Sequence, residues 1–146
     1  MPEIKGRPVL PGAVRGQALV SHKGFNTLAS FKKRTGIYSN KMVCTDHDNP
    51  DLYGKIITGA ILCLPYTIGS TAAGHAFQRV AKKGLGPKAL LFSERIDPLT
   101  AAGVILADIW AESRIVTVDE LGHEFLETVR EGQSIEVKQD GTVIII

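Results

Sequence analysis

The fold is decided by the stretch Ile61-Leu62-Cys63-Leu64-Pro65-Tyr66-Thr67-Ile68-Gly69-Ser70-Thr71-Ala72-Ala73-Gly74-His75-Ala76-Phe77. It begins with an apolar run that is typical of a buried strand and that ends at Pro65. After a short loop, Gly69-Ser70 precedes apolar residues at the i, i+3, i+4 and i+7 spacing of one helix face, namely Ala73, Ala76, Phe77 and Val80. The stretch therefore predicts a strand, a short loop and an amphipathic helix in succession.

Ser70 falls at or next to the N-cap of this predicted helix. The backbone N–H groups of a first helical turn lack partners, and with the positive end of the helix dipole they favour an anion. Gly69 has no Cβ and would let a ligand approach the backbone. Two interpretations are open: Ser70 is a reactive or ligand-binding hydroxyl, or Gly69-Ser70 is only a good helix start, because serine is a preferred N-cap residue.

Composition narrows the class of protein. With 146 residues the chain is long enough for a proper core, and we expect a single domain over residues 1–146. A net charge of +2 argues against a nucleic-acid partner, which would require a denser basic surface. No apolar run approaches the ~20 residues of a membrane span, and the N-terminus lacks the apolar segment of a signal peptide. We therefore expect a cytoplasmic location and no membrane partner.

The pattern of short apolar runs divides the chain into two halves. Up to about residue 66, runs separated by glycine and proline predict strands of a small barrel-like sheet, over residues 8–10, 17–21, 41–44 and 60–64. Cys44 and Cys63 lie in two of these runs without metal-ligand spacing, so we expect buried free thiols rather than a disulfide.

The second half alternates helix and strand. Strands are predicted over residues 88–93 and 114–118, and two more over 134–137 and 142–146, joined by an Asp140-Gly141 turn. Thr117 and Glu120 resemble a capping box that would open a helix closed by Gly132. Another helix is predicted with an apolar face of Leu99, Ala102, Gly103, Leu106, Ala107 and Trp110, which makes Trp110 a core residue. The fold class is mixed β/β/α.

Several short motifs follow one another in a specific order along nearly the whole chain: Gly16-Gln17-Ala18-Leu19-Val20, Asn49-Pro50-Asp51-Leu52-Tyr53-Gly54-Lys55, Leu64-Pro65, Gly69-Ser70, Pro87-Lys88-Ala89 and Ala101-Ala102-Gly103. This ordered set resembles the small subunit of the aconitase X family. The resemblance implies an α/β fold, the swivelling β/β/α domain of aconitases. It also implies a large-subunit partner that carries an iron–sulfur cluster and most of the substrate pocket, so that this chain itself would bind no cofactor and no metal.

The activity implied by the resemblance is that of a hydro-lyase, a dehydratase acting on a small hydroxy acid. Two substrate classes are known for the family, cis-3-hydroxy-L-proline in bacterial members and mevalonate 5-phosphate in archaeal members. The serine of the Gly-Ser motif is the family's catalytic base, and the matching residue here is Ser70. Archaeal members tend to have a Gly-Gly segment near residues 24–31, which this chain lacks, so we expect cis-3-hydroxy-L-proline, with mevalonate 5-phosphate as the alternative.

The implied chemistry is consistent with the residues present. Dehydration of a 3-hydroxy acid expels hydroxide, a poor leaving group that needs a Lewis acid or a general acid. Two cysteines on separate strands cannot hold an iron–sulfur cluster, so we expect the chain to be inactive without its large subunit. A serine base needs its alkoxide stabilised, and a helix N-terminus supplies part of that.

Other residues have weaker signals. We expect Gly69 and Thr71 to contact the substrate beside Ser70. We also expect Asn26 and Thr27 to be exposed on the loop 24–31 and to offer hydrogen bonds over an apolar floor. The alternative for that loop is that its phenylalanines merely fill the barrel end. Asp46-His47-Asp48-Asn49-Pro50-Asp51 resembles a metal loop by composition only, and a solvated acidic turn fits better.

Two other function classes stay open. His75 follows a glycine-rich turn, as the phosphorylated histidine does in the swivel domains of phosphoenolpyruvate-utilising enzymes, although it lies a turn further into the helix. The chain could then be a phosphocarrier. The third class is a non-catalytic binding or scaffold subunit.

Overall fold

A computed structural model describes residues 1–32, 37–38 and 40–146 of the chain. The strands are β1 (Glu3–Lys5), β2 (Arg7–Leu10), β3 (Val14–Val20), β4 (Phe25–Asn26), β5 (Ile37–Tyr38), β6 (Lys41–Met42), β7 (Ile61–Leu64), β8 (Thr67–Ile68), β9 (Ala89–Phe92), β10 (Val116–Asp119), β11 (Ser134–Val137) and β12 (Thr142–Ile145). The helices are α1 (Thr27–Ser30), α2 (Thr71–Lys82), α3 (Pro98–Trp110) and α4 (His123–Thr128).

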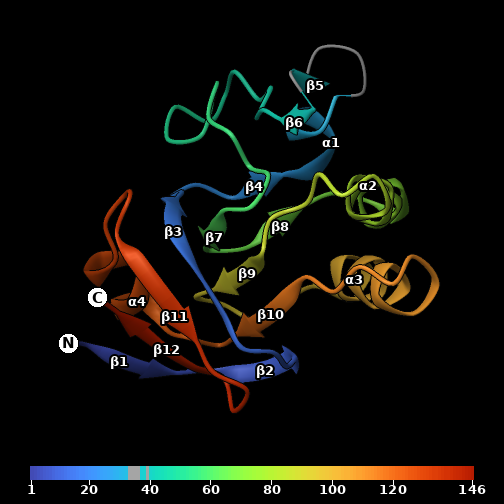
Figure 1. Ribbon diagram of the computed structural model, residues 1–146. Coiled ribbons are helices and arrows are strands. Elements are labelled where there is room, and N and C mark those ends of the chain that lie inside the picture. Colours follow the sequence, from blue (N-terminus) through green and yellow to red (C-terminus); the bar gives the residue numbers. More distant parts are fainter. Residues whose placement is uncertain (33–36, 39) are drawn as a thin grey trace.

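The main sheet has eight strands in the order β1-β12-β11-β3-β7-β9-β10-β2. Its two outer strands, β1 and β2, are consecutive in the chain and are separated only by Gly6, so the segment from Glu3 to Leu10 closes the sheet into a small barrel (Figure 1). A Cβ at Gly6 would lie 2.6 Å from the backbone oxygen of Asp119, so the connection between β1 and β2 requires glycine. The predicted barrel-like sheet is present, but the first half of the chain does not form it alone, because β9, β10, β11 and β12 supply half of its strands. The strand predicted over residues 41–44 is β6, which pairs with β5 outside this sheet.

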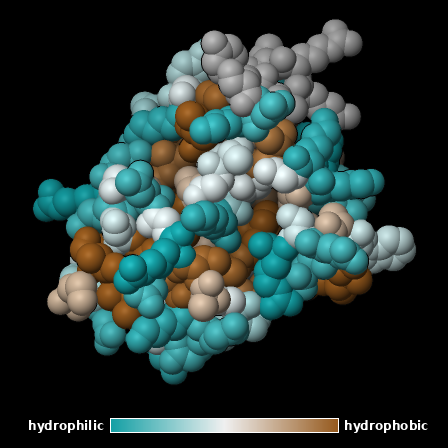
Figure 2. Space-filling view, in the orientation of Figure 1, coloured by the Kyte–Doolittle hydropathy of each residue, from teal (hydrophilic) through white to brown (hydrophobic). Residues whose placement is uncertain are grey.

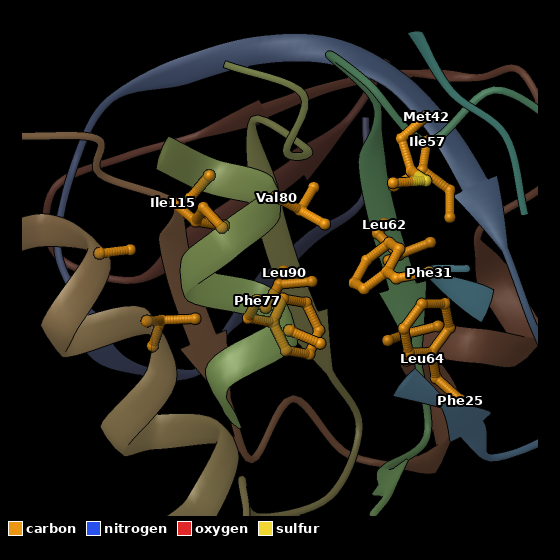
Figure 3. Close-up of a cluster of buried hydrophobic side chains, with 14 of the residues drawn as sticks. Phe25, Phe31, Met42, Ile57, Leu62, Leu64, Phe77, Val80, Leu90 and Ile115 are labelled. Atoms are coloured by element: carbon orange, nitrogen blue, oxygen red, sulfur yellow. The ribbon is translucent and has the colours of Figure 1, made fainter. Parts of the chain in front are cut away.

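Strands β3, β7, β9 and β10 run parallel at the centre of the sheet. Successive side chains of a strand point to opposite faces, and this alternation separates two cores. Ile61 and Cys63 of β7 belong to the core inside the barrel, which α4 also joins through Phe125. Leu62 and Leu64 belong to the outer core, between the sheet and helices α2 and α3 (Figure 3).

Helices α2 and α3 lie side by side over the outer face of the sheet (Figure 1). They approach closely at one pair of glycines. A Cβ on Gly74 would lie 2.5 Å from the backbone oxygen of Leu99, and a Cβ on Gly103 would lie 2.4 Å from the backbone oxygen of Gly74. Both clashes would be with backbone atoms, so each helix requires glycine where it crosses the other.

The predicted strands and the predicted helix after Gly69-Ser70 are confirmed within two or three residues at most ends. The capping box is wrong: Thr117 lies inside β10, where its hydroxyl donates to the backbone oxygen of Ile115. Helix α4 starts after Gly122, whose φ is +90°, and it ends at Thr128 rather than near Gly132. Glycine adopts that positive φ without strain, and it leads the chain from β10 into the helix.

The predicted core role of Trp110 is also wrong. Its side chain is 77% exposed, and Leu99 and Ala102 of the same predicted face are exposed too. The buried face of α3 keeps Gly103 and Ala107 of the predicted set and adds Thr100 and Val104. The helix is apolar on most sides, so its periodicity could not identify the buried face.

On the face shown in Figure 2, hydrophobic residues gather in several patches that are bordered by hydrophilic residues. In the described part of the chain, none of the helices is both long enough and apolar enough to cross a membrane. Both cysteines are buried and free, as expected.

Candidate functional site

Ser70 is the N-cap of α2, with extended backbone angles of φ −111° and ψ −166°. Its backbone oxygen accepts the first hydrogen bond of the helix, from the amide of Ala73 at 2.9 Å. Its side chain is exposed and makes no capping hydrogen bond. The predicted N-cap position is therefore confirmed, while the usual capping contribution of a serine hydroxyl is not made.

Gly69 is exposed and extends the chain from β8 toward the helix. A Cβ at this position would lie 2.3 Å from the Cβ of Ala73. Glycine is therefore required here by the packing of the turn against the first turn of α2. A Gly69→Ala variant would disturb the turn itself, so it cannot report on ligand approach alone.

The loop with Asn26 and Thr27 does lie next to this turn. Strand β4 pairs in parallel with β8, and the register places Asn26 opposite Ile68. Asn26 is half-buried, and its Oδ1 accepts a hydrogen bond from the amide of Ala29 at 3.2 Å, so that it caps α1. Thr27 is fully buried and its hydroxyl has no partner among the described residues, so the prediction that it is exposed is wrong.

Phe25 and Phe31, on either side of the buried Thr27, hold this loop against the rest of the protein. Phe25 and Phe31 are buried and contact Phe77 of α2, with ring centroids 6.1 and 5.2 Å from it (Figure 3). All three belong to the outer core rather than to the barrel interior. The loop therefore anchors the region of α2 to the sheet instead of filling a barrel end.

Two further candidates from the sequence lie on α2. Thr71 is the first helical residue, and its side chain lies outside the described part of the structure. His75 is exposed one turn into the helix. Positions 70 and 75 are separated by about 140° around a helix axis, so the two side chains do not share a face.

A hydrogen-bond network beside the turn has no clear sequence signal. The hydroxyl of Thr67 in β8 donates to Oδ1 of Asp97, the N-cap of α3, and lies 2.8 Å from the hydroxyl of Thr100. Thr100 donates its own hydroxyl to Asp97 Oδ1 at 2.7 Å and its amide to Oδ2 at 2.9 Å. Burial raises the pKa of Asp97, but the hydrogen bonds from Thr67 and Thr100 outweigh it and leave that pKa below its usual value. In the sequence, Asp97-Pro98 is a typical helix start, but nothing there indicates the bond from Thr67 to Asp97.

The motif Asn49-Pro50-Asp51-Leu52-Tyr53-Gly54-Lys55 serves the fold. Asn49 is buried and donates from Nδ2 to the hydroxyl of Ser21 at 3.0 Å, while Asp51 accepts from the amide of His22 at 2.9 Å. The motif thus joins its loop to the end of β3. At the other end of the acidic segment, Asp46 accepts from the amide of Asp48 at 3.0 Å, as in a turn.

An iron–sulfur cluster does not fit the residues described here. Cys63 and Cys44 are buried, and burial raises the pKa of both thiols, which disfavours the thiolates that ligate iron. Within residues 1–32, 37–38 and 40–146, no three His, Cys, Asp or Glu side chains gather as a metal site would require.

Sequence comparison adds independent findings. The family profile described as "Aconitase X swivel domain" matches residues 3–146. The phosphomevalonate dehydratase small subunit of Pyrococcus furiosus is 36% identical over 107 residues, which cover 73% of this chain and 74% of that protein. The protein of the same name from Methanocella arvoryzae is 31% identical over 144 residues, or 99% of this chain and 97% of the relative.

Solved structures agree with this relationship. The crystal structure of Thermococcus kodakaraensis aconitase X in its holo-form superposes with a TM-score of 0.83 at 27% identity, covering 100% of this chain and 99% of the other. The solution NMR structure of a UPF0107 protein gives a TM-score of 0.78 at 27% identity and covers 99% of each chain. The profile covers nearly the whole chain, and the fold agrees over its full length. The chain therefore belongs to the aconitase X family, as a small subunit made of the swivel domain.

Proposed function

We propose that this chain, as the small subunit of an aconitase X-type dehydratase, takes part in removing water from mevalonate 5-phosphate. The relatives at 36% and 31% identity carry the name phosphomevalonate dehydratase small subunit, and this supports the second of the two expected substrates over cis-3-hydroxy-L-proline. We give these names more weight than the missing Gly-Gly segment near residues 24–31, which favours cis-3-hydroxy-L-proline.

Ser70 is the residue we assign as proton acceptor. The supporting observation is that its hydroxyl is exposed at the start of a twelve-residue helix and makes no capping bond. In the dehydration of a 3-hydroxy acid, the proton next to the carboxylate would pass to Oγ of Ser70 while hydroxide leaves from the neighbouring carbon. The positive end of the α2 dipole favours the serine alkoxide and an anionic substrate group at the same place.

The proposal divides the reaction between two chains. Ser70 is exposed here, whereas a serine alkoxide is stabilised best where water is excluded. The described residues also do not fit an iron–sulfur cluster. We therefore assign the cover over Ser70, the cluster and most of the substrate pocket to a separate large subunit. This chain contributes Ser70, the backbone of Gly69 and the first turn of α2, whereas the buried Thr27 is left out.

The test is a comparison of the two substrates on the reconstituted complex. We expect the chain and its large subunit together to dehydrate mevalonate 5-phosphate with a kcat/KM at least about 100-fold above that for cis-3-hydroxy-L-proline. Neither chain alone should dehydrate either substrate. The opposite substrate ratio would overturn the substrate assignment. Turnover by this chain alone would overturn the division between two chains.

A further inference from the structure

The position of the Ser70 hydroxyl is not fixed by any capping contact of its own. Its side chain makes no capping hydrogen bond. The location of Oγ therefore depends on the backbone path from β8, through Gly69, into the first turn of α2. Whatever holds that backbone in place decides whether a proton acceptor would lie within reach of a substrate.

The backbone before Ser70 is held by Thr67. Its hydroxyl donates to Asp97 Oδ1 and lies 2.8 Å from the hydroxyl of Thr100. Asp97 is the N-cap of α3, and Thr100 belongs to the first turn of that helix. The first residue of β8 is therefore bonded to the start of α3, three residues before Ser70.

The backbone after Ser70 is held by Gly74. The backbone oxygen of Leu99 lies 2.5 Å from the place where a Cβ of Gly74 would stand, so α3 contacts α2 backbone to backbone at this point. Gly103 makes the reciprocal contact with Gly74. The first turn of α2 therefore cannot shift toward α3, four residues after Ser70.

Both contacts are made by one short segment, residues 97–103 at the start of α3. We propose that this segment positions the Ser70 hydroxyl, with Thr67 and Asp97 as positioning residues. The inference rests on the proposed role of Ser70 as proton acceptor. Thr67 and Asp97 act through the backbone of the turn and need not touch the substrate.

The chain offers matched variants for the test, which uses the complex with the large subunit. Thr67→Val removes the hydroxyl but keeps the β-branched shape, and Thr67→Ser restores the hydroxyl. Thr117→Val is the control, because Thr117 in β10 is a threonine whose hydroxyl donates one bond, to the backbone oxygen of Ile115; Thr117 is buried and Thr67 is half-buried. This control measures how the loss of one threonine hydrogen bond affects stability and activity when the bond lies outside the network of Thr67, Asp97 and Thr100.

A displacement of a reacting group by 1 Å lowers the rate by as much as about 100-fold. We expect Thr67→Val to lower kcat at least about tenfold, with KM changed less than about twofold and subunit assembly intact. Thr67→Ser should recover most of kcat, and Thr117→Val should keep it despite a similar fall in melting temperature. Such a split between kcat and KM would not follow from a merely structural role.

Two results would count against the inference, and they are distinguishable. If Thr67→Val has the same kcat as Thr117→Val while Ser70→Ala is inactive, the positioning role is wrong and the assignment of Ser70 stands. If Ser70→Ala is as active as the unchanged complex, the proposed role of Ser70 fails and the positioning role fails with it.

Discussion

Gly103→Ala is the substitution whose effect the packing of α2 on α3 predicts most clearly. In an exposed helix interior, replacing glycine by alanine stabilises by about 1 kcal/mol. At residue 103 the new Cβ would lie 2.4, 2.8 and 2.9 Å from the oxygen, Cα and carbonyl carbon of Gly74. All three atoms are backbone, so no side chain can rotate away and the two helices must move apart.

The size of the effect follows from the two opposing contributions. Overpacking of a buried site costs about 1–3 kcal/mol, and a clash with three backbone atoms belongs at the upper end of that range. After about 1 kcal/mol of helix propensity is subtracted, Gly103→Ala should lower the free energy of unfolding by about 2 kcal/mol. For a domain of this size that corresponds to a fall in Tm of roughly 4–8 °C.

The assay is thermal and urea unfolding followed by circular dichroism, with Ala102→Gly as control. Ala102 is exposed on the neighbouring position of the same helix, so that variant measures the propensity contribution alone and should cost about 1 kcal/mol. The reasoning would be refuted if Gly103→Ala raised Tm, because the helices would then have room at their crossing.

The remaining predictions concern the outer core, the barrel closure and a buried thiol. Phe77→Ala should lower the free energy of unfolding by about 3–5 kcal/mol, since Phe77 is fully buried and contacts Phe25 and Phe31; a cost below 1 kcal/mol in urea unfolding would contradict this. Arg7→Met should lower Tm because it leaves the buried Asp119 carboxylate without its two bonds to Arg7, of 2.8 and 2.6 Å, and adding Asp119→Asn should recover part of the loss. Burial raises the pKa of the Cys63 thiol far above its ordinary value of 9.0, so unfolding releases a proton above that pH. The free energy of unfolding should therefore fall as pH rises above about 9, by up to about 1.4 kcal/mol per pH unit more than in Cys63→Ala, and equal slopes would contradict the burial effect.

The elements that could be predicted are those whose local sequence signal is not opposed by contacts with distant segments. The apolar run 61–64, the start of α2 after Gly69-Ser70 and the Asp140-Gly141 turn were all signalled by their own residues. The capping box at Thr117 failed because long-range pairing in β10 prevailed over a local helix signal. The prediction that Trp110 lies in the core was wrong because α3 has apolar residues on several sides, so only its packing against α2 decides which side is buried.

In the candidate site too, features that depend on local sequence could be predicted, and features that depend on distant contacts could not. The position of Ser70 as N-cap depends on local sequence and was predictable. The burial of Thr27 and the bonds from Thr67 to Asp97 depend on contacts between segments about 30 or more residues apart, which no local pattern records. Gly74 precedes His75 in the sequence, and the structure gives it a packing role against α3 that no local pattern indicates.

The most direct test of the proposed function is the turnover number of the Ser70→Ala complex with mevalonate 5-phosphate, measured beside His75→Ala as a matched change on the same helix. A positioned proton acceptor contributes about 100-fold or more to the rate. We therefore predict that Ser70→Ala lowers kcat at least about 100-fold while the two subunits still assemble, and that His75→Ala keeps most of the activity. Turnover of Ser70→Ala within twofold of the unchanged complex would contradict the assignment of Ser70 as proton acceptor.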